Sequence, residues 1–200
     1  MFLLDSNVFI EAKDRYYGFD FAPGFWAWLD FHFKSGRILS IQDVRDELIG
    51  REDDLSLWVR ERKQYFRSTS ESVTLEKFGE VNNWAVTHGY PQEALQVVQN
   101  NPTDFMLVAY AAAHDLVVVT HEKSAPQSKK RVMIPDACKA MGVKVTDTFT
   151  MLQETGIRLI IEDPPNNVSF DQDFGVPDGV NRPLPCLLYT SDAADDCCRV

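Results

Sequence analysis

Short apolar runs separated by longer amphipathic segments make up most of this 200-residue sequence. Residues 2–4, 38–41 and 116–120 are almost wholly apolar, and residues 143–146 alternate between apolar and polar side chains. Short apolar runs are typical of strands buried on both faces, which belong to parallel sheets covered by helices. We therefore predict strands over these four segments and a further strand over residues 157–161.

The segments between the predicted strands carry apolar residues at helical spacing and end at glycines, prolines or capping residues. We predict helices over residues 8–17, 23–35, 42–49, 53–68, 72–89, 91–98, 102–114, 135–141 and 147–154. Strands and helices then alternate along the chain, which is the order that builds a parallel sheet with helices on both faces. The predicted fold class is α/β, a three-layer α/β/α sandwich around a central, mainly parallel sheet.

Length and composition indicate one domain with a substantial core, since 44% of the residues are hydrophobic. We place this domain at residues 1–161 and predict a flexible tail over residues 162–185, where Pro, Gly, Asn and Asp are frequent. No apolar run approaches the roughly 20 residues that a membrane span needs. The N-terminus also lacks the basic region and cleavage site of a signal peptide, so we expect a soluble, cytoplasmic protein.

Three of the four cysteines lie in residues 186–200. This segment resembles the conceptual translation of a transposase adapter used in sequencing libraries, and we expect it not to belong to the natural protein. Cys138 is then the one remaining cysteine, which fits a reduced compartment.

The formal net charge of −10 argues against broad electrostatic capture of nucleic acid, because such capture depends on Lys and Arg side chains. It does not exclude a nucleic-acid enzyme, because divalent metal can neutralise a site rich in carboxylates. The same negative field would attract a basic partner.

Four acids stand at the places where active sites of α/β sheets collect. Asp5 and Glu122 follow predicted strands, Glu47 lies beside the apolar stripe of a helix, and Asp104 falls in the first turn of a buried helix. Each acid alone has an ordinary explanation, as a cap or turn acid, a solvated helix residue or a partner of the helix dipole. Because parallel strands end at one edge of their sheet, we expect the four to converge there.

Four neighbouring carboxylates repel one another strongly unless a cation lies among them. Oxygen ligands suit hard divalent cations, so the pattern points to Mg²⁺ or Mn²⁺. The polar segment after the last long apolar run contains four basic residues: Lys123, Lys129, Lys130 and Arg131.

The sequence resembles the PIN superfamily of ribonucleases, the fold of the VapC-type toxins. The matching pieces are Leu3-Leu4-Asp5-Ser6-Asn7, Val44-x-x-Glu47-Leu48, Asp104 with Leu107-Val108-Ala109, and Val119-Thr120-x-Glu122. The resemblance implies that Asp5, Glu47 and Asp104 coordinate metal. It also implies that Asn7 supports the first acid, and that Glu122 stands where the family usually has Asp.

From this resemblance we expect a metal-dependent endoribonuclease that is the toxin of a toxin–antitoxin pair, forms a homodimer and binds a cognate antitoxin protein. In such an enzyme the four basic residues Lys123, Lys129, Lys130 and Arg131 would contact the backbone of the RNA substrate. The alternative is a catalytically inactive PIN-fold module that binds protein. A haloacid-dehalogenase-like phosphatase is disfavoured because position 7, where it needs a second Asp, holds Asn7. A receiver domain is disfavoured because its adjacent acids and late Lys have no counterpart here.

An aromatic cluster near residue 26 leaves two interpretations open. Phe25, Trp26 and Trp28 could stack on RNA bases, but their near-helical spacing is more typical of a core or of a subunit contact.

Overall fold

A five-stranded parallel sheet forms the centre of the computed structural model, which describes residues 1–158. The strand order is β3-β2-β1-β4-β5, with β1 in the middle. The strands are β1 (Phe2–Leu4), β2 (Ile38–Ile41), β3 (Phe66–Arg67), β4 (Val117–Val119) and β5 (Lys144–Thr146). Every pairing between neighbouring strands is parallel, so their carboxyl ends all meet at one edge.

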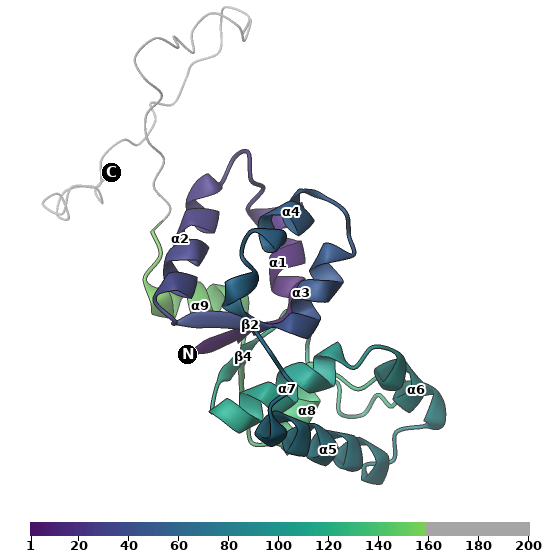
Figure 1. Cartoon of the computed structure of the whole chain (residues 1–200). Helices are drawn as coiled ribbons and strands as arrows, with labels where there is room; N and C mark the ends of the chain where they lie inside the picture. Colours follow the sequence, from purple (N-terminus) through teal and green to yellow (C-terminus); the bar gives the residue numbers. More distant parts are fainter. Residues whose placement is uncertain (159–200) are drawn as a thin grey trace, which may run out of the picture. The chain divides into compact units, whose positions relative to one another are not determined.

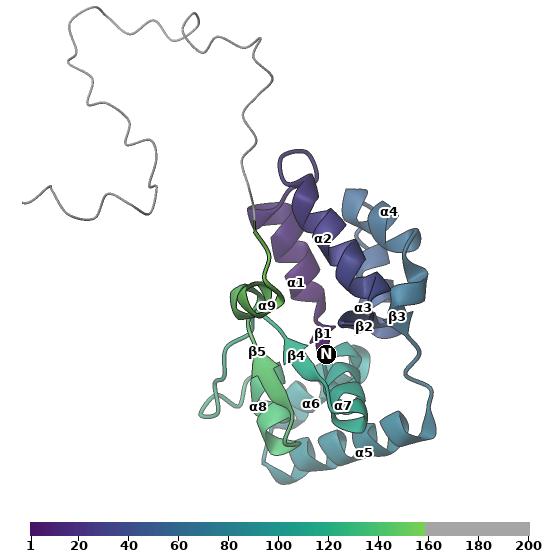
Figure 2. The ribbon, with the colours of Figure 1, turned by 90° about the vertical axis from the view of Figure 1, so that its left-hand side faces the viewer.

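Helices cover both faces of this sheet. They are α1 (Ser6–Glu11), α2 (Pro23–Lys34), α3 (Gln42–Ile49), α4 (Asp54–Arg60), α5 (Ser72–Thr87), α6 (Gln92–Asn100), α7 (Thr103–His114), α8 (Ile134–Ala140) and α9 (Thr148–Thr155). Figures 1 and 2 show α1, α2 and α4 on one face and α5, α7 and α8 on the other. The predicted three-layer α/β/α class is confirmed.

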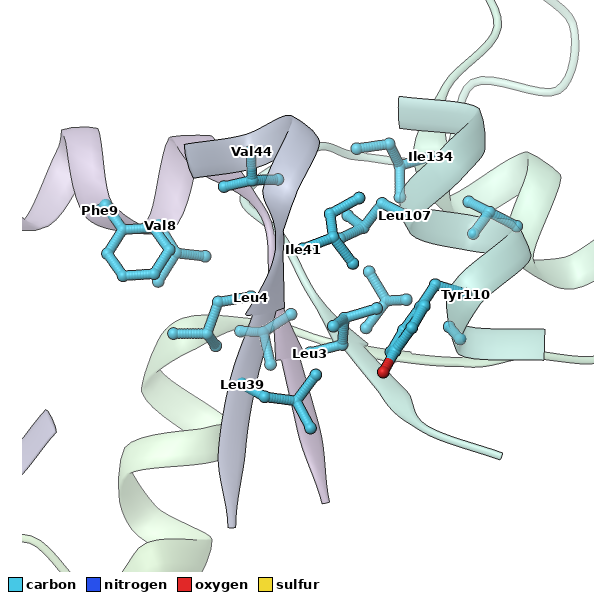
Figure 3. Close-up of a cluster of buried hydrophobic side chains, with 14 of the residues drawn as sticks. Leu3, Leu4, Val8, Phe9, Leu39, Ile41, Val44, Leu107, Tyr110 and Ile134 are labelled. Carbon is cyan, nitrogen blue, oxygen red and sulfur yellow. The ribbon is translucent and has the colours of Figure 1, made fainter. Parts of the chain in front are cut away.

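The core continues through the sheet on both sides of β1. Leu3 and Leu4 are completely buried. Figure 3 shows Leu4 on the same side as Phe9 and Leu3 on the side of Leu107 and Tyr110. Successive side chains of a strand point to opposite faces, so a strand at the centre of the sheet needs apolar residues at every position. This explains the uninterrupted apolar run that opens the sequence.

Local capping signals set the ends of several helices. The carboxylate of Asp5 accepts a hydrogen bond from the backbone N–H of Ser6, where α1 begins. Asn101 accepts bonds from the backbone and the hydroxyl of Thr103 at the start of α7. Asp104 therefore lies in the first helical turn, as the sequence predicted.

The predicted helix over residues 53–68 is wrong in its second half. The helix α4 ends at Arg60, and residues 66–67 instead form β3 at the edge of the sheet. Phe66 is 4% exposed, and its ring lies 6.0 Å from that of Phe9. Burial of this ring beside β2 outweighs the local helical pattern, because the pattern carries no information on a partner strand.

Phe25 and Trp26 are buried, with exposures of 1% and 4%, so the core interpretation of the aromatic cluster holds for both. The indole N–H of Trp26 donates to the carbonyl of Tyr17 over 2.6 Å. Neither ring is available to a subunit or to an RNA base, whereas Trp28 is half-buried.

Residues 157 and 158 are not in a strand, and the rest of the strand predicted over 157–161 lies outside the described residues. The predicted tail and the adapter-like segment also lie outside them. Among the described helices, none combines the length and apolarity that crossing a membrane requires.

Candidate acidic site at the carboxyl edge of the sheet

One cavity of about 480 Å³ lies at the carboxyl edge of the sheet, and all four predicted acids line it. Asp5 and Glu122 follow β1 and β4, which are paired neighbours in the sheet. Glu47 comes from α3, and Asp104 comes from the first turn of α7. Ser6, Asn7, Asn101 and Arg131 complete the polar part of the wall. The structure thus brings together acids from the two ends of the domain, because parallel strands end at the same edge.

Asp5 is the most deeply placed of the four acids, with an exposure of 2%. One carboxylate oxygen accepts from the backbone N–H of Ser6 at 2.7 Å, and the other accepts from the hydroxyl of Thr120 at 2.8 Å. Burial raises the pKa of Asp5 to about 7, and the charges of Asp104 and Glu122 add to this rise. The two hydrogen bonds oppose it but are too weak to offset the loss of solvation.

Thr120 connects Asp5, Asn7 and Glu122 through hydrogen bonds of its hydroxyl group. It was not among the site residues predicted from the sequence. Its hydroxyl oxygen accepts from the amide of Asn7 at 3.0 Å and from the backbone N–H of Glu122 at 3.1 Å. The carbonyl oxygen of the Asn7 side chain accepts from the backbone N–H of His121. Asn7 therefore reaches Asp5 indirectly, through Thr120. The signal that could have found Thr120 is a hydroxyl residue placed directly after the longest β-branched run.

Glu47 also lines the cavity, from the side of α3. Partial loss of solvation raises the pKa of its carboxyl group, and the charge of Asp104 raises it further. The side chains of Ser6 and Arg131 act in the opposite direction. Loss of solvation thus raises the pKa values of both Asp5 and Glu47, and the charge of Asp104 adds to both rises.

Arg131 supplies positive charge inside the cavity. One guanidinium nitrogen donates to Glu122 at 2.7 Å and to Asp104 at 3.0 Å. The second carboxylate oxygen of Glu122 accepts from the backbone N–H of Ile134, where α8 begins. Burial raises the pKa of Glu122, while the bond from Ile134 and the charge of Arg131 lower it. Both oxygens of Glu122 are therefore already hydrogen-bonded.

The other three basic residues of the loop lie apart from these acids. Lys129 donates to the backbone carbonyl of His88 at 3.1 Å, and Lys123 and Lys130 do not line the acidic cavity. Of the four basic residues that the sequence grouped together, Arg131 thus lines the acidic cavity and the three lysines do not.

The donor chemistry of the cavity fits a hard divalent cation, since its polar wall consists mostly of carboxylate, amide and hydroxyl groups. Burial raises the pKa values of Asp5, Glu47 and Glu122, and neighbouring acids add to the rise, so that a bound cation would favour their ionised forms. Within residues 1–158, however, no three His, Cys, Asp or Glu side chains are gathered closely enough to hold an ion as they stand. A cation at this site would therefore draw the acids together and compete with Arg131.

Comparison with known proteins finds a matching family model and a similar solved structure. Residues 2–159 match the family model described as "Domain of unknown function (DUF4411)". The crystal structure of FitAcB from Neisseria gonorrhoeae is similar over 72% of this chain and 96% of that chain, with 19% sequence identity and a TM-score of 0.44. No curated protein shows a significant sequence match to this chain.

Proposed function

We propose that this chain, which belongs to the DUF4411 family of domains of unknown function, is a metal-dependent endoribonuclease that hydrolyses RNA phosphodiester bonds. The observation that carries the proposal is the convergence of Asp5, Glu47, Asp104 and Glu122 on one cavity at the carboxyl edge of a parallel sheet. The resemblance of the surrounding sequence to PIN-domain ribonucleases supports the same chemistry. Clefts outside the carboxyl ends of strands are also where α/β proteins bind their ligands.

In this proposal Asp5, Glu47 and Asp104 would hold Mg²⁺ or Mn²⁺. When bound, such an ion supplies a Lewis acid for the phosphoryl oxygen and lowers the pKa of a water molecule. The chain itself fixes the direction of the Asp5 carboxylate through Thr120, and Asn7 fixes Thr120 in turn. Hydrogen bonds of this kind orient a ligand before the ion arrives.

Glu122 would orient the attacking water or help to bind a second ion. Because Arg131 and the Ile134 N–H occupy its two oxygens, this role requires the guanidinium to leave one of them. A substrate phosphate is a suitable new partner for Arg131, since guanidinium and phosphate groups pair well. RNA binding would thereby release both Glu122 and Asp104 from Arg131.

Replacement of Asp5 tests the nuclease proposal. Asp5→Asn should cut labelled single-stranded RNA slower by orders of magnitude in Mn²⁺ while keeping the circular-dichroism spectrum of the parent. Asp46→Asn is a matched control, because Asp46 lies on α3 next to Glu47 with its side chain 64% exposed. If Asp5→Asn cuts as fast as the parent, and chelator changes neither protein, the metal-nuclease proposal is wrong.

One observation favours the alternative function, a PIN-fold module that binds protein without turnover. Arg131 bonds Asp104 and Glu122 at the same time, so an internal cation already compensates two of the acids. Calorimetry with Mn²⁺ separates the two functions. Saturable binding that disappears in Asp5→Asn supports the nuclease, whereas no heat of binding up to millimolar Mn²⁺ supports the inactive module.

The same resemblance supports two partners, a cognate antitoxin and a second copy of this chain in a homodimer, and both are part of the proposal. A cytoplasmic location is also part of it. The net charge of −10 would speed the capture of a basic antitoxin segment. Light scattering of the purified chain tests the dimer, and a monomer at high concentration would remove it. A small DNA-binding protein encoded next to this chain would support the antitoxin.

A further inference from the structure

A second cavity, of about 320 Å³, lies outside the acidic site. It is formed where α8 packs against the C-terminal end of α5, and Figure 2 shows these two helices side by side. Its aromatic, polar and charged lining residues are Trp84, His88, Tyr90, Ser124, Asp136 and Lys139. Its volume is at the lower end of the range for small-ligand pockets.

Three aromatic rings form one wall of this cavity. The rings of Trp84 and His88 are stacked, with centroids 5.3 Å apart and an angle of 27° between their planes. The ring of Tyr90 lies 5.9 Å from Trp84 at 65°. Tyr90 is buried, whereas His88 is exposed, so the wall is anchored at one end and open at the other. Such a surface suits a flat aromatic ligand.

Positive charge lies beside this aromatic wall, although the chain as a whole is strongly acidic. The ammonium group of Lys129 lies 4.5 Å from the centre of the Tyr90 ring and bonds to the carbonyl of His88. Lys139 on α8 lines the cavity and is exposed. The combination of a stacking surface with nearby lysines matches both parts of a nucleotide, its base and its phosphate.

The inner wall carries a fixed hydrogen-bond acceptor. The carboxylate of Asp136 accepts from the Ser124 hydroxyl and from the backbone N–H of Ala125, and these bonds hold it in place. A carboxylate oxygen can accept a further bond from an amino or imino group at the edge of a base.

The same loop lines both cavities. Glu122 and Arg131 face the acidic cavity, while Ser124 faces the aromatic one. Two residues of extended chain span at most roughly 7 Å, so the walls at Glu122 and Ser124 are close neighbours. A single-stranded RNA with one phosphate at the acids can therefore place a nearby base against Trp84.

We propose that the aromatic cavity binds a base of a single-stranded RNA substrate, stacked against Trp84 and His88, with Lys129 and Lys139 beside its phosphate. The proposal rests on the proposed function, since RNA is the ligand of both cavities. It adds a site that holds the strand next to the acids but takes no part in hydrolysis. Binding at this site therefore needs neither metal nor Asp5.

The experiment measures binding of a fluorescein-labelled single-stranded RNA pentamer by anisotropy in the presence of EDTA. Trp84→Ala and His88→Ala should each weaken binding about tenfold, and Trp84→Phe should restore most of it, because every aromatic face can stack on a base. A pentamer of abasic RNA should bind the parent as weakly as the intact pentamer binds Trp84→Ala. The Asp46→Asn protein, which is changed outside both cavities, should bind like the parent.

His114→Ala is the matched control for His88→Ala. Both histidines are exposed at the end of a helix, and the ring of His114 lies 4.2 Å from that of Tyr110. Since His88 is exposed, its replacement keeps the test valid even if Trp84→Ala fails to fold. The proposal is overturned if the parent shows no binding in EDTA, if His88→Ala binds like His114→Ala, or if abasic RNA binds as tightly as the intact pentamer. The rate at which Asp5→Asn cuts RNA in Mn²⁺ decides the nuclease proposal separately, because the binding experiment in EDTA contains no metal.

Discussion

The hydroxyl of Thr120 donates a 2.8 Å hydrogen bond to the carboxylate of Asp5 and so joins the ends of two neighbouring strands. The same hydroxyl oxygen accepts two further bonds, from Asn7 and from the backbone of Glu122. Thr120 is 2% exposed, so water cannot replace these bonds. The carboxylate at the centre of the site is thus oriented by a side chain from the next strand of the sheet.

Thr120→Val should lower the free energy of unfolding by about 2–3 kcal/mol, because a methyl group of similar size leaves the buried carboxylate of Asp5 and two half-buried polar groups without a bond. Thr120→Ser keeps the hydroxyl and should cost only about 1 kcal/mol. Urea denaturation measures both values. Equal stability of the Val and Ser variants would show that these bonds do not stabilise the sheet edge.

The raised pKa of Asp5 predicts a stability that falls as pH rises. The folded carboxyl group keeps its proton up to a pH of about 7, whereas in the unfolded chain it ionises near its ordinary pKa of 3.8. The folded state therefore binds more protons between these values, and stability is lost across this window, up to about 4 kcal/mol. In EDTA, replacing Asp5 by Asn should therefore change the free energy of unfolding differently at the two pH values. At pH 8 the change should be about 3 kcal/mol more stabilising than at pH 5.

Asp147→Asn is the control for this pH dependence. The backbone N–H of Thr150 lowers the pKa of Asp147, so this group is ionised in both states from pH 5 to pH 8. Its replacement should change the stability by the same amount at the two pH values. A pH-independent effect of Asp5→Asn as well would contradict the raised pKa of Asp5.

Arg131→Gln tests whether the guanidinium competes with a metal ion. Removal of its charge should raise the affinity for Mn²⁺ roughly fivefold, in line with about 1 kcal/mol for a half-exposed ion pair. Isothermal titration calorimetry gives this affinity, and Arg60→Gln, an exposed arginine on α4, is the control. A weaker affinity for Mn²⁺ in Arg131→Gln would mean that the arginine organises the acids for the ion.

The loop lysines outside the acidic cavity should act through the RNA backbone. Replacement of Lys123 and Lys130 together by Gln should weaken RNA binding and reduce the slope of log affinity against log salt by about 0.7 for each phosphate that is no longer neutralised. The double replacement of Lys34 and Lys77, which lie on other elements, is the control. An unchanged slope in Lys123→Gln/Lys130→Gln would exclude these residues from the RNA path.

The sequence alone was sufficient for the parts of this protein that depend on neighbouring residues. The apolar run before Asp5 predicted a central buried strand, because burial on both faces requires apolar side chains at every position. The capping residue Asn101 and the apolar run after it predicted a helix with Asp104 in its first turn, since capping is a local interaction. Parallel strand order then predicted that Asp5 and Glu122 would end at one edge of the sheet.

Tertiary structure decided what depends on partners distant in the sequence. Phe66 joins the sheet because Phe9 and β2 bury it, against the helical pattern around it. Arg131 bonds Asp104 across 27 positions, and Thr120 bonds Asp5 across 115. A sequence pattern shows which side chains an element buries, but which groups satisfy a buried carboxylate is set by packing. The orientation of Asp5 and the counter-charge of the site therefore emerged only when the strands and helices were assembled.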